Sequence, residues 1–348
     1  MDREVPFIII SIMIMIYMMT ILGMYIYENP KNNGKGDEKK ESTITHKDIG
    51  KRGDMGNQIF QMACIIAAGK RGGAKVILPK RVEELGVSKI FDLTRYEWRD
   101  IETDRTYYEY DNYEKIMIPE DGRRYEIKGY RQAYKYFEEE GEEIREIFKP
   151  KEEMIKEIKK RVPKEYLAVH IRRGDYIKAI HKIPLLREFR QCKIEYYRRG
   201  IIKLREEYPE YQVIVCTDSP EWVETIIDKL GDKIELAPKY EGIEGKYSDF
   251  CILYLARGVV MSNSTYSFWG AYLRNNRSIV APTPWWNPEG FIGTAMGLDG
   301  PYLHYPEWTL MDADTGEIVR EAKEKKGERE DNNHETLNIY KLVRGMIV

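Results

Sequence analysis

Apolar segments of two kinds alternate through the second half of this chain, and they constrain its fold more than any other feature. Short continuous apolar runs are typical of buried strands, and longer runs with apolar residues three and four positions apart are typical of helices. We predict strands at residues 166–171, 211–216, 258–261 and 278–281. We predict helices at residues 195–207, 221–230, 249–256 and 265–274. Strands that alternate with helices indicate an α/β fold with a parallel sheet.

Two adjacent arginines stand where the first of these strands ends, in the segment VHIRRGD at residues 169–175. Ligands of α/β sheets bind at the carboxyl ends of the strands. Arg172 and Arg173 offer rigid sets of N–H donors there that match the oxygens of a phosphate. The segment therefore favours a nucleotide or sugar-nucleotide enzyme. A plain surface pair of an arginine with Asp175 is the alternative interpretation.

Four polar residues in a row, SNST at 262–265, separate a predicted strand from a predicted apolar helix. Ser264 or Thr265 fits an N-cap, and a helix N-terminus beside hydroxyl groups binds phosphate well. Asn263 also begins a glycosylation sequon, which we discount because a glycan there would block the predicted pocket. Asn276 begins a second sequon, and we predict glycosylation there.

Carboxylates also stand at the ends of predicted strands. Asp218 follows the strand at 211–216, where it can accept hydrogen bonds from a guanine base or a ribose. A helix cap ahead of Glu221 explains Asp218 equally well. Asp312 and Asp314 form a DxD triplet of the kind associated with metal–nucleotide sites, but the Thr-Gly that follows indicates a hairpin turn. The histidines and cysteines show no ligand spacing, so we expect no metal.

The uncharged run at residues 7–27 is dominated by Ile and Met. At about 1.5 Å per residue, a helix of this length crosses the hydrocarbon core of a bilayer. No small-x-small cleavage site follows it, so we predict an uncleaved anchor with the lipid bilayer as partner. More lysines follow the run than precede it, and the positive-inside rule alone places the large domain in the cytosol.

The overall charge is nearly balanced, with 56 Lys and Arg against 58 Asp and Glu. Binding to the phosphate backbone of nucleic acid needs an excess of basic residues on the surface. We therefore expect no nucleic-acid partner.

Several segments together resemble the α-1,2-fucosyltransferases of glycosyltransferase family eleven. They follow the family's order: GDMGNQIFQ at 53–61, GYRQ at 129–132 with KYF at 135–137, HIRRGDY at 170–176, CTDSPEW at 216–222 and SNSTYSFWGA at 262–271. The histidine-x-arginine-arginine element is shared with α-1,6- and protein O-fucosyltransferases. That element alone therefore does not choose the linkage.

The resemblance implies an α/β, GT-B-like fold of two Rossmann-like domains, preceded by a single transmembrane helix. It implies inverting transfer of L-fucose from GDP-fucose to the 2-hydroxyl of a terminal galactoside on a glycan, without a metal or other cofactor. It also implies a Golgi membrane location with a luminal catalytic domain, in a single-pass type II protein. We divide the chain into an N-terminal tail (1–6), an anchor (7–27), a stem (28–47), an acceptor-side α/β domain (48–164), a nucleotide-sugar-binding α/β domain (165–316) and a charged C-terminal segment (317–348).

The resemblance also assigns roles to single residues. Arg172 is the predicted catalytic residue that stabilises charge on the leaving β-phosphate, and Asn57 is predicted to lie near the reacting sugar. A core histidine bonded to backbone explains His170 equally well. The predicted donor-binding residues are His170, Arg173, Asp175, Asp218, Asn263, Ser264 and Thr265.

Two further functions are compatible with these motifs. One is a GDP-fucose transferase with a different linkage or a protein acceptor, which product analysis separates. The second is a catalytically inactive, membrane-anchored glycan-binding protein, which would bind GDP without turnover. Asp54 and Asp175 are the two candidates for the base that takes the proton of the acceptor hydroxyl.

Overall fold

The structure is a computed structural model that describes residues 40–51, 53–109, 113–174, 176–177, 190–275, 278–287 and 302–322. The chain divides into two compact units, Met1–Lys40 and Glu41–Val348. The fold below is that of the second unit. The predicted donor ligand Asp175 and the predicted glycosylation site Asn276 lie outside the described residues.

The first sheet has five parallel strands among the described residues, in the order β3-β2-β1-β5-β4. Helix α2 (Met55–Arg71) follows the central strand β1 and is buried along most of its length. Gly72 ends the helix and donates its N–H to the carbonyl oxygen of Ala68. The strands are β1 (Thr43–Thr45), β2 (Lys75–Leu78), β3 (Glu97–Trp98), β4 (Arg105–Tyr107) and β5 (Arg124–Ile127).

Short helical segments complete this half of the fold. They are η1 (Lys80–Glu84), α3 (Gly86–Ile90), η2 (Tyr134–Tyr136), α4 (Gly141–Ile147) and α5 (Glu152–Ile158).

The second sheet has seven strands among the described residues, in the order β12-β11-β10-β9-β6-β7-β8. Neighbouring strands are parallel except for β11 and β12. In chain order the parallel strands run 3-2-1-4-5-6 across the sheet, which is the order of doubly wound dinucleotide-binding folds. The strands are β6 (Leu167–Ile171), β7 (Val213–Thr217), β8 (Ile234–Leu236), β9 (Gly258–Val260), β10 (Ser278–Thr283), β11 (Thr309–Asp312) and β12 (Ile318–Arg320).

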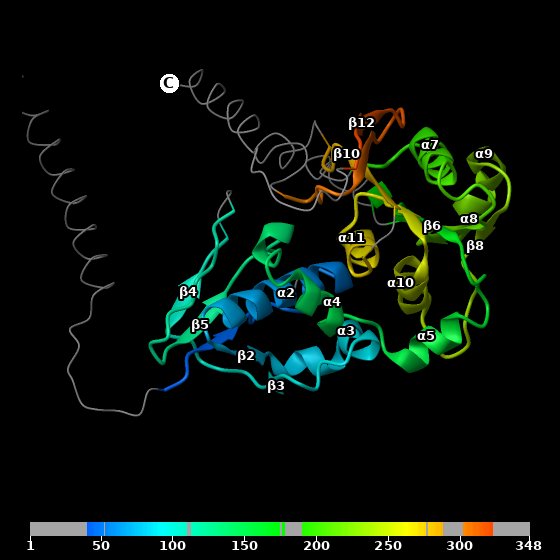
Figure 1. The fold of residues 1–348 in the computed structure, drawn as a ribbon. Coiled ribbons are helices and arrows are strands. Elements are labelled where there is room, and N and C mark those ends of the chain that lie inside the picture. The colour runs from blue at the N-terminus through cyan, green and yellow to red at the C-terminus, as the bar shows by residue number, and fades with distance from the viewer. Residues whose placement is uncertain are drawn as a thin grey trace, which may run out of the picture. The chain divides into compact units, whose positions relative to one another are not determined.

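Helices cover both faces of this sheet. In Figure 1, α7 (Ile194–Arg205), α8 (Pro220–Glu224) and α9 (Ile227–Leu230) lie on one side of β6, and α10 (Gly245–Leu255) and α11 (Thr265–Tyr272) lie on the other. Every residue of β6 is buried, as expected for a central parallel strand. Its side chains alternate, so Ile171 packs with the α7 side while its neighbour His170 contacts Tyr266 of α11.

Aromatic side chains join the two halves of the unit. The ring of Phe60, on α2, lies 4.7 Å from that of Phe268 and 4.9 Å from that of Trp269, both on α11. Phe137 adds a ring 5.0 Å from Trp269. These residues belong to one continuous cluster that also contains Ile44 of the first sheet. The unit therefore has a core shared between its two sheets.

The transmembrane part of the expected fold class needs correction. No helix among the described residues is long and apolar enough to cross a membrane. The longest of them, α2, has 17 residues and buries its apolar side chains inside the protein. The fold is therefore α/β with two largely parallel sheets, and no transmembrane helix is part of it as described. Residues 7–27, on which the anchor and the bilayer partner were predicted, lie outside the described residues.

Two predicted boundaries also need correction. Residues 43–45, which the sequence places in the stem (28–47), form the central strand β1, and Ile44 is fully buried. Residues 318–320, placed in the charged C-terminal segment, form the edge strand β12. Both strands are three residues long and bordered by polar sequence, so local hydrophobicity does not reveal them.

Candidate functional site

The carboxyl ends of β6 and β9 meet at the point where the strand order of the second sheet reverses. His170 lies near the end of β6, and its Nδ1 is 2.7 Å from Oγ of Ser262, which follows β9. Burial, together with the charge of Arg172, lowers the pKa of His170 to about 3. The ring is therefore neutral at physiological pH, and its contacts are those of a buried core histidine. Its donor-binding role stays a prediction.

The loop after β6 is held by Asp218. One carboxylate oxygen of Asp218 accepts hydrogen bonds from the backbone N–H of Arg173 (2.9 Å) and Gly174 (3.1 Å). The other lies 3.3 Å from Nη1 of Arg172. These contacts of Asp218 fix the loop that carries the two arginines, and its donor-binding role stays a prediction.

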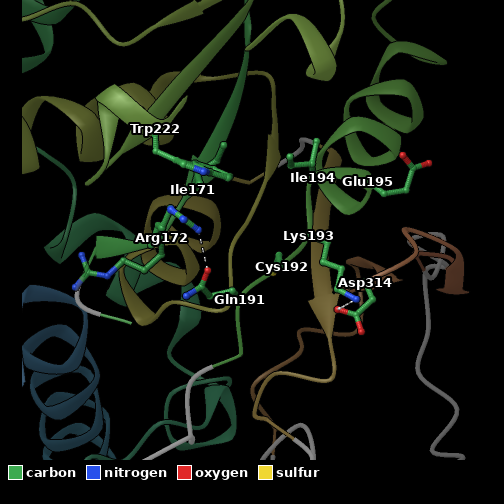
Figure 2. Close-up of a pocket in the computed structure, with 10 residues that line it drawn as sticks. Ile171, Arg172, Gln191, Cys192, Lys193, Ile194, Glu195, Trp222 and Asp314 are labelled. Carbon is green, nitrogen blue, oxygen red and sulfur yellow. Dashed lines mark hydrogen bonds and ion pairs between the residues drawn. The ribbon is translucent and has the colours of Figure 1, made fainter. Parts of the chain in front are cut away.

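The two arginines have different surroundings. The Arg172 guanidinium lies 5.7 Å from the ring of Tyr176, and Figure 2 shows its side chain extending away from Cys192 and Lys193. Arg173 stacks on Trp222 at 4.1 Å and donates from Nη1 to Oε1 of Gln191 over 3.1 Å. The two guanidinium groups therefore have different partners within the protein, and their roles toward the donor stay predictions.

The SNST segment is largely buried, and its side chains bond neighbouring backbone. Asn263 is 3% exposed, and its Nδ2 donates to the carbonyl oxygens of Arg190 (2.7 Å) and Trp285 (2.9 Å). The Nδ2 group of this amide is therefore bound to backbone, and the donor-binding role of Asn263 stays a prediction. Ser264 is the N-cap of α11, and its Oγ accepts from the N–H of Tyr266 over 3.3 Å.

The first residues of α11 lie directly against the first residues of α2. A Cβ added to Gly56 would come within 2.5 Å of the carbonyl carbon of Thr265 and of the Tyr266 nitrogen. A glycine is therefore required there for the two helix ends to meet. This contact brings the GDMGNQ segment of the first sheet beside the SNST segment of the second.

Asn57 follows this contact glycine on α2. Its Oδ1 accepts a hydrogen bond of 2.6 Å from Nε2 of Gln132. A Cβ on Gly53, whose φ is +76°, would lie 2.2 Å from Nδ2 of Asn57. The amide of Asn57 is thus confined on both sides.

A half-buried carboxylate supports the loop that carries Gln132. Glu109 accepts the backbone N–H groups of Tyr130 (2.6 Å) and Arg131 (2.7 Å). The loop takes left-handed backbone conformations at Gly129 (φ +102°) and Arg131 (φ +54°). The Glu109 contacts stabilise this loop. Sequence reasoning used GYRQ as a family motif and did not identify Gln132 or Glu109 as site residues.

Asp249 is a further residue that sequence reasoning missed. It lies on α10 and accepts a hydrogen bond from the backbone N–H of Thr217, at the end of β7, and burial raises its pKa to about 7. A carboxyl group with a perturbed pKa near a ligand-binding edge is a functional candidate. The signal was a lone acid in the apolar helix sequence YSDFCILYL at 247–255.

The DxD triplet forms the turn between β11 and β12. Oδ1 of Asp312 accepts the N–H groups of Asp314 (3.0 Å) and Thr315 (2.8 Å), and Asp314 pairs with Arg190 at 2.5 Å. The hairpin interpretation agrees with this geometry. Within the described part of the chain, no three His, Cys, Asp or Glu side chains are grouped as a metal site would require. That the reaction needs no cofactor stays a prediction.

Asp54, a candidate base, precedes α2 at its N-cap position. Its backbone is extended, its side chain is exposed, and its carboxylate makes no capping bond to the helix. The carboxylate is therefore accessible beside Asn57. Its role as base stays a prediction.

A doubly wound sheet with an arginine loop at its switch point, facing a second parallel sheet, is the arrangement of an α/β nucleotide-dependent enzyme. Residues 10–296 match the family described as Glycosyl transferase family 11, and the chain belongs to that family. The predicted family is confirmed, and with it the prediction that the chain is an enzyme, of the fucosyltransferase type.

Two characterised relatives illustrate the range of the family. The chain is 30% identical over 169 residues to an alpha-1,2-colitosyltransferase of Escherichia coli, in a match that covers 47% of this chain and 57% of the relative. It is 22% identical over 296 residues to galactoside alpha-(1,2)-fucosyltransferase 2 of Pongo pygmaeus, covering 77% of this chain and 80% of the relative. The first match thus spans little more than half of that relative's length.

Solved structures of other fucosyltransferases are similar at low identity. The fucosyltransferase NodZ from Bradyrhizobium is 14% identical, with a TM-score of 0.43 and coverage of 68% of this chain and 94% of NodZ. POFUT1 in complex with GDP is 11% identical, with a TM-score of 0.44 and coverage of 69% and 96%.

Proposed function

We propose that this enzyme transfers L-fucose from GDP-fucose to the 2-hydroxyl of a terminal galactoside, with inversion at the fucose C1. Membership of the family supports a sugar transfer. The Pongo pygmaeus relative is named a galactoside alpha-(1,2)-fucosyltransferase, which supports the donor sugar, the linkage and the galactoside acceptor.

The observation that carries the proposal is the position of Arg172. It follows β6, the first strand of the doubly wound sheet, and Asp218 holds its guanidinium at 3.3 Å. A fixed guanidinium at a strand's carboxyl end can bind a diphosphate with paired N–H donors. Because Asp218 also holds the backbone of the loop, this guanidinium is placed before the donor arrives.

The proposed chemistry breaks the bond between the fucose C1 and the β-phosphate oxygen of GDP. The electron pair stays on that oxygen, and Arg172 stabilises the growing negative charge, an effect of several kcal/mol in a preorganised site. The acceptor hydroxyl oxygen bonds to C1 from the opposite face, which converts a β-linked donor into an α-linked product. Its proton passes to a base, for which exposed Asp54 is the described candidate.

Asn57 faces the same junction from the first sheet. Because Gln132 occupies its Oδ1, the Nδ2 group is the donor that Asn57 can present to a sugar or phosphate oxygen. The contact between Gly56 and Thr265 places this amide beside the start of α11. The proposed site is therefore built from both sheets.

One specific observation favours a second donor. The Escherichia coli relative with 30% identity is named an alpha-1,2-colitosyltransferase, so we keep colitose as a second candidate sugar with the same linkage. A different linkage, a protein acceptor or an inactive glycan-binding protein would each give a different result when the product is analysed.

The test uses the full chain with GDP-fucose or GDP-colitose and a panel of galactosides, and it follows the release of GDP. Acceptor-dependent release with GDP-fucose, and an α-1,2 linkage in the product by NMR, is the expected result. Faster turnover of GDP-colitose would identify colitose, in place of fucose, as the donor sugar. GDP binding without turnover on any acceptor would contradict the proposal. The Golgi location stays a prediction.

A further inference from the structure

A cavity of about 560 Å³ lies at the carboxyl edge of the second sheet. Figure 2 shows its two sides: Arg172 comes from the loop after β6 and Trp222 from α8, and Lys193 and Glu195 come from the start of α7. Asp314, in the turn after β11, completes the second side. The volume is within the usual range for sites that bind small molecules.

The cavity lies on the opposite face of the sheet from three of the predicted donor ligands, His170, Ser264 and Thr265. Ile171 lines it and packs with the α7 side, whereas His170, the preceding residue of β6, bonds Ser262 and contacts α11. Ser264 and Thr265 begin α11 on that other face. Arg172, the proposed phosphate ligand, borders the cavity. A molecule bound here would therefore meet the donor at Arg172 without occupying the face of His170.

The polar groups of the cavity are held in place before a ligand arrives. The Arg173 guanidinium is fixed by its stack on Trp222 at 4.1 Å and by its bond to Gln191 at 3.1 Å. That bond also connects the two sides of the cavity. A guanidinium has five N–H donors, so a single bond to Gln191 leaves Arg173 able to donate further.

Among the described residues, most of the charges that line the cavity are compensated by neighbours, whereas Arg173 contacts the neutral Gln191 and the Trp222 ring. Arg172 pairs with Asp218 at 3.3 Å, and Asp314 pairs with Arg190 at 2.5 Å. Two arginines bond Glu195 and lower its pKa to about 2. A ligand with several charges would therefore find few uncompensated partners here. A neutral molecule with many hydroxyl groups fits, because each hydroxyl both donates and accepts.

We infer that this cavity binds the sugar residues next to the terminal galactose of the acceptor glycan. The inference rests on the proposed function and extends it from the reacting galactose to the residues that select the acceptor. Carboxylate, amide and guanidinium groups bind the sugar hydroxyls. Ile171 and Ile194 pack against the C–H faces of the rings.

The experiment compares methyl β-galactoside with a galactose-terminated trisaccharide as acceptors for the full chain. We expect the wild type to have a KM for the trisaccharide at least tenfold below that for methyl β-galactoside. Gln191→Ala and Lys193→Ala should raise the trisaccharide KM at least fivefold more than the methyl β-galactoside KM, without the same rise in the KM for GDP-fucose. Lys203→Ala is the matched control, since Lys203 lies on the same helix and pairs with Glu206 away from the cavity.

Equal KM values for the two acceptors in the wild type would overturn the inference. A parallel rise in the KM for GDP-fucose would overturn it as well, because the cavity would then hold the donor. If the wild type releases no GDP with any galactoside, the proposed function fails by itself. NMR line broadening of the trisaccharide without donor then decides: binding lost in Gln191→Ala supports the cavity, and binding unchanged in that variant rejects it.

Discussion

Gln132 donates a hydrogen bond from Nε2 to Oδ1 of Asn57 over 2.6 Å, and these two residues lie 75 positions apart in the chain. The bond connects the loop after β5 with the first turn of α2. Because of this bond, Oδ1 of Asn57 is occupied by the protein, and Nδ2 is the end of the amide that can bind a ligand.

Replacing Gln132 by glutamate tests this orientation. An ionised carboxylate has no hydrogen to donate, so it should attract Nδ2 of Asn57 and turn the amide over. We expect kcat of Gln132→Glu at pH 7.5 to be about 10- to 100-fold below that of the wild type, as for loss of about 1–3 kcal/mol. The ratio of variant to wild-type kcat should rise as the pH falls toward 5, because a neutral carboxyl group regains a donor.

Gln132→Ala is the control for that pH profile. It removes the side-chain donor at every pH, so its kcat ratio should stay low and flat. A flat ratio for Gln132→Glu as well would show that the orientation of the Asn57 amide does not matter.

Gly56→Ala should destabilise the protein although alanine favours helices. The new Cβ would meet the backbone of Thr265 and Tyr266 at 2.5 Å, and overpacking of this kind costs about 1–3 kcal/mol. Gly245, the first residue of α10, has no atom within 4 Å of an added Cβ. Gly245→Ala should therefore be neutral or stabilise by up to about 1 kcal/mol. Urea denaturation of both variants measures the difference, and equal effects would reject the close contact.

Arg172→Ala should lower kcat by about 10²- to 10³-fold, the effect expected when one preorganised donor to a developing charge is lost. Arg172 is only partly buried, so the variant should fold, which circular dichroism can verify. Arg172→Lys keeps the charge but loses the paired donors, and it should recover only part of the rate. A rate close to that of the wild type in Arg172→Ala would remove this residue from the mechanism.

His170 should make stability depend on pH. Its pKa is about 3 in the folded protein and about 6.5 when unfolded, so the unfolded state binds more protons between these values. The free energy of unfolding should therefore fall as the pH drops below 6.5, by up to about 1.4 kcal/mol per pH unit.

Asp249 acts in the opposite direction. Its raised pKa of about 7 stabilises the fold at low pH and loses this effect as the pH rises toward 7. The two slopes oppose each other in the wild type, so the informative quantity is the difference between wild type and His170→Gln. We expect this difference in unfolding free energy to grow in favour of the wild type from pH 4 to 6.5. A constant difference would contradict the buried neutral histidine.

Local sequence predicts the second sheet well and misses the central strand β1 of the first sheet. The predicted strand at 166–171 and helix at 195–207 correspond closely to β6 and α7. These elements are continuous and apolar on their buried sides, so the spacing of apolar residues along the sequence predicts them. The predicted helix at 221–230 is divided into α8 and α9. By contrast, β1 is stabilised by pairing with β2 and β5, which are distant in the sequence.

The residue types that form the site are easier to predict than the hydrogen-bond partners of those residues. Arg172 and Ser264 stand where the strand and helix ends place them, and Ser264 caps α11 as the sequence indicates. Asn263 and Asp218, predicted donor ligands, each bond the backbone of neighbouring loops, which local sequence does not predict. Such bonds form between segments that only the tertiary fold brings together. The same reason explains why Gln132 was missed as the partner of Asn57.

The aromatic cluster of Phe60, Phe137, Phe268 and Trp269 has a consequence for how the molecule unfolds. Each sheet has its own strands, yet this cluster includes side chains from both halves. Cutting the chain near residue 164 would leave large apolar surfaces exposed on both fragments. Residues 41–348 should therefore melt in a single cooperative transition, and neither fragment should reach a native state unless the other is present.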